Sequence, residues 1–296
     1  MKILIPTLLS YVVTGLGLNT VPRTLFKMSR PTTIPQSALL SFSGAAVAGA
    51  HLSDFVKHDF VIATTLTAFT CANSMIVNDF FDAKRGTDSA SKNEIVAGTV
   101  TESQVENYLF VSYALLAVGI CTLYETQIAL CLLATQVITI AYTPFFKPSP
   151  FVKNLVVAGI VGAAPLVGGL AAQGDLAFDS QLPEMCVGIF CIILHKEILM
   201  DVVDLKDDLN SGIHTIPFIC GKETAVDVSF ALLVAAATMT ESPWTAMGPL
   251  YMMYQVKRAR DSINTSEETP TLEDVLDSFK YSSAATIVSY VYNAIF

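Results

Sequence analysis

The sequence predicts an all-α polytopic membrane protein, in which a bundle of nine transmembrane helices surrounds a central cavity. The first observation is the composition: 52% of the 296 residues are hydrophobic and only 15% are charged. A soluble domain usually carries about 25% charged residues, and a mean hydropathy of +0.54 argues against an ordinary globular enzyme. The second observation is that apolar segments of roughly membrane-spanning length recur along the whole chain.

Nine apolar segments are separated by polar connectors that alternate in length and charge. A helix needs about 20 residues to cross a bilayer, and the sixth and eighth segments are somewhat shorter than that. The expected spans are residues 34–52, 59–78, 105–124, 126–143, 154–173, 184–200, 223–240, 243–256 and 279–296.

The basic residues predict how these spans are oriented. With nine spans, 16 of the 17 lysine and arginine residues fall on one side of the membrane, and only Lys57 falls on the other. Cytosolic loops of membrane proteins are enriched in lysine and arginine. We therefore expect that side to be the cytosolic face or its equivalent in an organelle, and which organelle stays open.

The same pattern predicts how the chain is divided. Residues 1–28 form an N-terminal segment, interpreted as a targeting segment, an interfacial helix or the remainder of a longer leader, and residues 29–296 form a single transmembrane domain.

The six cysteines lie mostly inside apolar segments without metal-ligand spacing, so we interpret them as small buried hydrophobic residues. Much of the net charge of −9 is concentrated in a few acidic runs, which argues against a nucleic-acid partner.

An acidic cluster follows the second apolar segment, in the sequence Asn-Asp-Phe-Phe-Asp. On a helix, Asn78, Asp79 and Asp82 would occupy about 100° of the surface. Gly86 then lets the chain leave the helix. Carboxylates at the mouth of a membrane helix are costly unless something positive binds there, so the cluster predicts a cation.

A second acidic cluster follows the sixth apolar segment and opens on the same predicted side. Asp201, Asp204 and Asp208 would lie within about 60° of arc on a continuous helix, and Glu197 extends that face by one turn. Acids on one stripe repel one another, so a shared divalent cation is expected. Hard oxygen ligands favour Mg²⁺, which usually brings substrate phosphates as further ligands. An acidic, solvated helix end is the structural alternative.

From about Arg30 onward, the chain resembles the UbiA superfamily of intramembrane prenyltransferases. Residues 78–82 match its Asn-Asp-x-x-Asp signature after the second helix, and residues 201–208 match its Asp-x-x-Asp-x-x-x-Asp signature after the sixth. Residues 142–147 and 153–154 are similar to its connector between the fourth and fifth helices. The resemblance implies that the metal ligands are Asn78, Asp79, Asp82, Asp88, Asp201, Asp204 and Asp208.

The chain departs from the family pattern around the first cluster. Many members have a third acid eight residues after the Asn, where this chain has Gly86 and places the acid two residues later as Asp88. That form is similar to the quinone-biosynthesis branch. Alignment on Gly98 puts Asn93 and Glu94 where members commonly have a basic residue and a proline. One phosphate-binding cation is therefore missing from its usual place.

The resemblance implies Mg²⁺-assisted transfer of a prenyl group from a polyprenyl diphosphate to an aromatic or quinone-precursor acceptor within the lipid bilayer. Metal ions and fixed cations would stabilise the negative charge that grows on the diphosphate, and the helix bundle would keep the carbocation from water. The candidate cations are Lys84, Arg85, Lys147, Lys153 and Lys206. The residues expected to act in catalysis are Asp82, Asp204, Tyr142 and Lys147.

Two other functions fit parts of the pattern. A membrane terpene cyclase of the same superfamily would use the same metals but quench the cation within the prenyl chain itself. A cation transporter with acidic gates would place its acids near the bilayer midplane and repeat its helices in inverted sense. Both clusters lie at helix ends on one face, which argues against the transporter. The acceptor and the prenyl chain length stay open.

Overall fold

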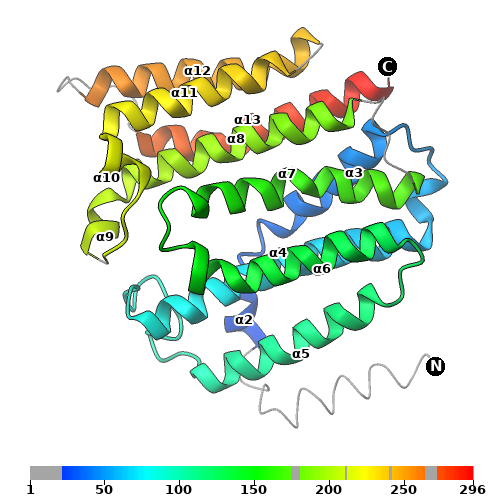
Figure 1. The fold of residues 1–296 in the computed structure, drawn as a ribbon, viewed down its shortest axis with the longest axis horizontal. Coiled ribbons are helices and arrows are strands. Elements are labelled where there is room, and N and C mark those ends of the chain that lie inside the picture. Colours follow the sequence, from blue (N-terminus) through cyan, green and yellow to red (C-terminus); the bar gives the residue numbers. More distant parts are fainter. Residues whose placement is uncertain (1–21, 175–180, 211, 240–241, 264–271, 296) are drawn as a thin grey trace.

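The computed structural model describes residues 22–174, 181–210, 212–239, 242–263 and 272–295, and the regular structure in these ranges is helical. The helices are α2 (Pro22–Met28), α3 (Ile34–Val47), η2 (Asp54–Val56), α4 (His58–Arg85), α5 (Glu102–Ile120), α6 (Thr126–Ala141), η3 (Tyr142–Phe146), α7 (Val152–Gln173), α8 (Leu182–Val203), α9 (Leu205–Asn210), α10 (Ile216–Cys220), α11 (Lys222–Thr238), α12 (Pro243–Ile263) and α13 (Leu272–Ile295). The long helices lie side by side, with α11 and α12 along one edge and α5 along the other (Figure 1).

Each of the nine expected segments coincides in large part with one long helix, namely α3 to α8 and α11 to α13. Among the residues that the structure describes, three helices are long and apolar enough to cross a membrane: His58–Arg85, Thr126–Phe146 and Val152–Gln173. A multi-pass membrane protein therefore fits both the composition and the fold. Membrane crossing by the other six helices, and with it the count of nine spans, stays a prediction.

Helix α2 is the described part of the expected N-terminal segment, whose residues 1–21 lie outside the described ranges. Leu25 and Met28 of α2 are buried in a cluster with Ile76 of α4 and Val105 of α5. Burial of these apolar side chains stabilises the packing of α2 against α4 and α5. The described part of the segment therefore packs against the bundle.

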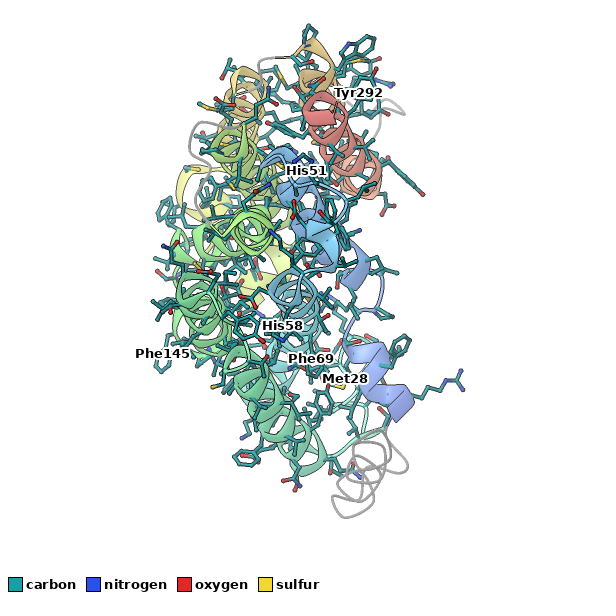
Figure 2. The ribbon with its side chains drawn as sticks, turned by 90° about the vertical axis from the view of Figure 1, so that its right-hand side faces the viewer. Met28, His51, His58, Phe69, Phe145 and Tyr292 are labelled. Atoms are coloured by element: carbon teal, nitrogen blue, oxygen red, sulfur yellow. The ribbon has the colours of Figure 1, made fainter. Side chains whose placement is uncertain are left out.

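Helix α4 carries the first acidic cluster at its C-terminal end, and the structure confirms the end that the sequence predicts. The helix runs to Arg85, and Gly86 caps it with a φ of 68°, a left-handed conformation that glycine adopts without steric cost. At the opposite end, Asp59 accepts hydrogen bonds from the backbone amides of Tyr124 and Glu125 at 3.0 and 2.9 Å. Figure 2, turned by 90° from Figure 1, labels the neighbouring His58. Helix α4 is thus fixed at both ends.

The central cavity expected from the sequence also stays a prediction. A hollow that the structure does show is open and apolar, and it lies between α7 and α8. Its lining includes Gly162, Leu166, Cys186 and Phe190, and none of the candidate site residues.

Helices α3 and α7 cross at a contact that only glycine permits. A Cβ atom added at Gly168 would lie 1.9 Å from the Ser41 carbonyl oxygen, and one added at Gly44 would lie 1.9 Å from the Pro165 carbonyl oxygen. Small residues that let two backbones approach closely are typical of helix contacts in membranes. This contact fixes α7, which begins at the candidate site.

Replacing Gly168 with alanine is expected to destabilise the protein by about 1–3 kcal/mol or more, because the methyl group meets a backbone atom and the two helices must separate. Thermal unfolding of the purified protein in detergent measures the effect. The matched control is Gly159→Ala on the same helix, where an added Cβ meets nothing within 4 Å. Equal unfolding temperatures for the two variants would contradict this packing.

Candidate active site

The candidate residues gather at one end of the bundle. They come from the C-terminal end of α4, from residues 142–154 between α6 and α7, and from the end of α8 with α9. We call residues 142–154 the α6–α7 junction. Within it, η3 contacts both α4 and α7, and α7 packs along α8. This end lies on the left of Figure 1, where α9 and α10 are labelled. The junction therefore connects the two acidic clusters.

In the first cluster, Asp82 is a buried carboxylate held from two sides. The Asn78 amide donates through Nδ2 to Asp82 Oδ2 at 2.9 Å, and Lys147 Nζ lies 2.5 Å from the same oxygen. Asn78 Oδ1 accepts from Lys147 Nζ at 3.3 Å and from the Thr143 hydroxyl at 3.2 Å. Asp82 is 2% exposed, and its Oδ1 has no hydrogen-bond partner among the described residues. One carboxylate oxygen is thus left for a ligand.

In the second cluster, Asp201 has the same kinds of partner. Lys153 Nζ lies 2.6 Å from Asp201 Oδ1 and 3.9 Å from Asp208 Oδ2. The Asn154 amide donates through Nδ2 to Asp201 Oδ2 at 2.8 Å. Both Lys153 and Asn154 belong to the first turn of α7 and are buried. The start of α7 therefore holds the end of α8 through charge and hydrogen bonding.

The structure corrects the prediction of a continuous acidic helix in the second cluster. Helix α8 ends at Val203, Asp204 is its C-cap with a ψ of 2°, and α9 begins separately at Leu205. Asp201 is buried, whereas Asp204 is exposed. Like charges at i,i+3 and i,i+4 destabilise a helix, and Asp201, Asp204 and Asp208 have these spacings. Their repulsion opposes an uninterrupted stripe.

Tyr142 is near both clusters. Its phenol is close enough to interact electrostatically with Asp82 of the first cluster and with Glu197, Asp201 and Asp208 of the second. It begins η3, a π-helical turn, and such turns occur frequently at functional sites. The structure therefore places this candidate where both clusters act on it.

Asp79 lies near the end of α4 and pairs with Arg30, whereas Asp88 lies in the loop that follows α4. Arg30 Nη2 lies 3.4 Å from Asp79 Oδ1. The Asn93 side chain is 2% exposed, and its Nδ2 donates to the Asp79 carbonyl at 2.7 Å and to Asp88 Oδ2 at 3.0 Å. Asn93, in a position where a basic residue is common, therefore holds Asp88 against the end of α4.

Glu94 has a structural role beside Asn93. It forms an ion pair with Lys27 of α2 and accepts a hydrogen bond from the Thr99 hydroxyl at 2.6 Å. The hydrogen bonds from Lys27 and Thr99 lower the pKa of Glu94 below its usual value. Glu94 thus stays charged and ties this loop to α2.

The five candidate cations differ in whether they contact the acidic clusters. Lys147 and Lys153 form ion pairs with cluster carboxylates. Lys84 Nζ lies over the Phe80 ring, 4.3 Å from its centroid, on the far side of α4 from Asp82. Arg85 Nη2 donates to the Pro144 carbonyl at 2.8 Å, which anchors η3 to the end of α4, and Lys206 is exposed on α9.

Four residues of this site are absent from the sequence-based candidates: Arg30, Asn93, Thr143 and Asn154. Thr143 and Asn154 adjoin Tyr142 and Lys153 in the connector motif, so their position in the sequence could have identified them as site residues. Arg30 reaches Asp79 across 49 residues of sequence, and nothing local indicates that contact.

The oxygen atoms of the site fit a magnesium ion that arrives with a phosphate ligand. Among the described residues, no three carboxylate, histidine or cysteine side chains converge as a ready-made metal site. Two buried oxygens, Asp82 Oδ1 and Asn154 Oδ1, lack hydrogen-bond partners. Mg²⁺ usually binds through one or two carboxylates plus substrate phosphates, so this donor set suits it.

Sequence comparisons place the chain in one family. The model of the UbiA prenyltransferase family matches residues 37–257. The digeranylgeranylglyceryl phosphate synthase of Natronomonas pharaonis is 31% identical over 224 residues, which is 75% of this chain and 78% of that protein. The protein of the same name from Methanopyrus kandleri is 27% identical over 226 residues, covering 75% of this chain and 79% of that protein.

Two solved structures have the same fold. A structure of digeranylgeranylglyceryl phosphate synthase aligns with a TM-score of 0.69 at 15% identity, over 92% of this chain and 98% of that chain. A UbiA homologue from Archaeoglobus fulgidus bound to GPP and Mg²⁺ aligns with a TM-score of 0.61 at 19% identity, over 92% and 99%. The resemblance seen in the sequence is thereby confirmed. The chain belongs to the UbiA prenyltransferase family.

Proposed function

We propose that this prenyltransferase moves a prenyl group from a prenyl diphosphate to an acceptor, with Mg²⁺, at the α6–α7 junction. One observation carries the proposal: the junction supplies Lys147 to Asp82 and Lys153 to Asp201, at 2.5 and 2.6 Å. A metal-bound diphosphate needs carboxylates for the metal and ammonium groups for the phosphates, and this end of the bundle has both. The homologue bound to GPP and Mg²⁺ supports it.

The lysines stabilise the leaving group. As the allylic C–O bond lengthens, negative charge grows on the diphosphate, and cations held where that charge develops lower the barrier. Lys147 and Lys153 are mostly buried, so their charges are less screened than in water. Mg²⁺, when bound, neutralises part of the same charge. Its proposed ligands are Asn78, Asp79, Asp82, Asp88, Asp201, Asp204 and Asp208.

In this proposal, Tyr142 faces the reacting end of the prenyl group. An aromatic ring attracts a cation over its face, and this tyrosine interacts electrostatically with both clusters that would hold the diphosphate. The rest of the prenyl chain requires an apolar environment, which the surrounding helices supply. Exclusion of water protects the carbocation until the acceptor attacks it.

We infer that the acceptor is a glyceryl phosphate with a free hydroxyl group. The support is the name shared by the relatives from Natronomonas pharaonis and Methanopyrus kandleri, which describes a glyceryl phosphate carrying two geranylgeranyl groups. An aromatic or quinone-precursor acceptor, and cyclisation without any acceptor, are the alternatives.

The test is a transfer assay with purified protein in detergent and geranylgeranyl diphosphate as donor. The arms contain geranylgeranylglyceryl phosphate, a hydroxylated aromatic acid or no acceptor, each with Mg²⁺ or with EDTA. We expect a doubly prenylated glyceryl phosphate that forms only with metal. A prenylated aromatic product would change the acceptor, a cyclic hydrocarbon formed without acceptor would establish the cyclase, and full turnover in EDTA would refute metal dependence.

A further inference from the structure

The two acidic clusters contain the same three residue types in similar arrangements. The asparagine and the lysine share one oxygen of Asp82 in the first cluster, and they contact different oxygens of Asp201 in the second. In what we call the first triad, Asn78, Asp82 and Lys147, the amide nitrogen lies 2.9 Å and the ammonium 2.5 Å from one carboxylate. In the second triad, Asn154, Asp201 and Lys153, the corresponding distances are 2.8 and 2.6 Å. The two acidic signatures contain Asn78 but not Asn154, which belongs to the connector motif between the fourth and fifth helices. The geometry therefore gives the second cluster an asparagine that matches the first.

Within the described part of the chain, each triad leaves one buried oxygen atom without a hydrogen-bond partner. In the first it is Asp82 Oδ1, and in the second it is Asn154 Oδ1, on a side chain that is 1% exposed. The orientation of the Asn154 amide follows from its neighbour, because the Asp201 carboxylate only accepts hydrogen bonds and must face the NH₂ group. The oxygen is then forced to the other side. A buried polar atom without a partner is costly, which indicates a ligand position.

The chemistry of this oxygen selects the kind of ligand. An amide oxygen only accepts, and diphosphate oxygens also only accept, so the two do not bind one another directly. A metal ion is attracted to such a hard oxygen donor. Because Lys153 is paired with Asp201 in this structure, a cation entering there requires that the ammonium be drawn toward a phosphate.

We propose that Asn154 is a metal ligand of the second cluster, through Oδ1, as the counterpart of Asn78 in the first. This inference rests on the proposed function, since the metal is the one that accompanies the diphosphate. Asn154 thereby adds a binding residue to the carboxylates that the sequence signatures predict.

The test exchanges the oxygen ligand for sulfur. Purified full-length protein is titrated with Mn²⁺ or Cd²⁺ in the presence of inorganic pyrophosphate, without prenyl donor or acceptor, for wild type and Asn154→Cys. Carbonyl oxygens suit Mn²⁺, whereas thiolates bind softer metals. We expect the ratio of Cd²⁺ to Mn²⁺ affinity to rise at least about tenfold in Asn154→Cys. A residue that merely holds Asp201, or that binds a water molecule or the acceptor hydroxyl, would leave the ratio unchanged.

Asn73→Cys is the matched control, because Asn73 is an equally buried asparagine on α4 that accepts from the Tyr108 hydroxyl outside the site. An equal rise in the control would overturn the inference. If Asn154→Cys fails to fold, Asn154→Leu replaces it, and unchanged Mn²⁺ affinity there is equally decisive. If wild-type protein binds no metal in the presence of pyrophosphate, the proposed metal dependence is refuted. If wild-type protein binds metal but the ratio of Cd²⁺ to Mn²⁺ affinity is unchanged in Asn154→Cys, only the role of Asn154 is refuted.

Discussion

Replacing Asp82 with asparagine is expected to lower the rate of prenyl transfer by about two to three orders of magnitude while the protein stays folded. The substitution keeps the size of the side chain but removes the negative charge of a carboxylate that is 2% exposed. Asp82 is a proposed ligand of the metal that neutralises charge on the leaving group, and stabilisation of developing charge in a buried site contributes effects of this size. Lys147, released from its ion pair, has a side chain 21% exposed and can reach water, so the fold survives.

Steady-state turnover with saturating donor and Mg²⁺ measures this effect, and thermal unfolding verifies the fold. The matched control is Asp227→Asn, because Asp227 forms an exposed ion pair with Arg260 at 2.9 Å on α11 and α12. An exposed pair contributes little, so turnover should change less than twofold. Wild-type turnover in Asp82→Asn would refute the assignment of Asp82, and an equal loss in both variants would attribute the effect to net charge.

Replacing Lys147 with methionine is expected to change two measurements in opposite directions. Turnover should fall by about a hundredfold, because a cation near the leaving group is lost. The affinity for Mn²⁺ without diphosphate should rise by about tenfold, because the ammonium lies 2.5 Å from Asp82 Oδ2 and repels a metal ion at that carboxylate. In wild-type protein, binding of metal and diphosphate should therefore be cooperative.

Metal titration by electron paramagnetic resonance, together with steady-state kinetics, provides both measurements. Arg260→Met removes an equal charge from the exposed pair with Asp227 and should change neither. A Lys147→Met variant whose metal affinity falls together with its turnover would contradict competition between the lysine and the metal. It would instead indicate that Lys147 holds the site in shape.

The first acidic cluster was predictable because its geometry is local. The spacing of Asn78, Asp79 and Asp82 determines their common face once the segment is helical, and Gly86 marks the end because glycine adopts a positive φ at low cost. The sequence does not predict the break at Asp204, because the repulsion among acids on consecutive turns was assigned to a bound cation and not to a change in the backbone.

By itself the sequence determined the helical class, the positions of the long helices, the family and the carboxylates at the ends of α4 and α8. These features follow from composition, apolar periodicity and motif spacing, which can all be read from short stretches of chain. Only the tertiary structure decided that Lys147 pairs with Asp82, that Lys153 and Asn154 pair with Asp201, and that Arg30 reaches Asp79. These contacts join residues 47 to 65 positions apart. Their partners depend on how α4, α7, α8 and the connecting segments that carry Arg30 and Lys147 pack together, which no local pattern specifies.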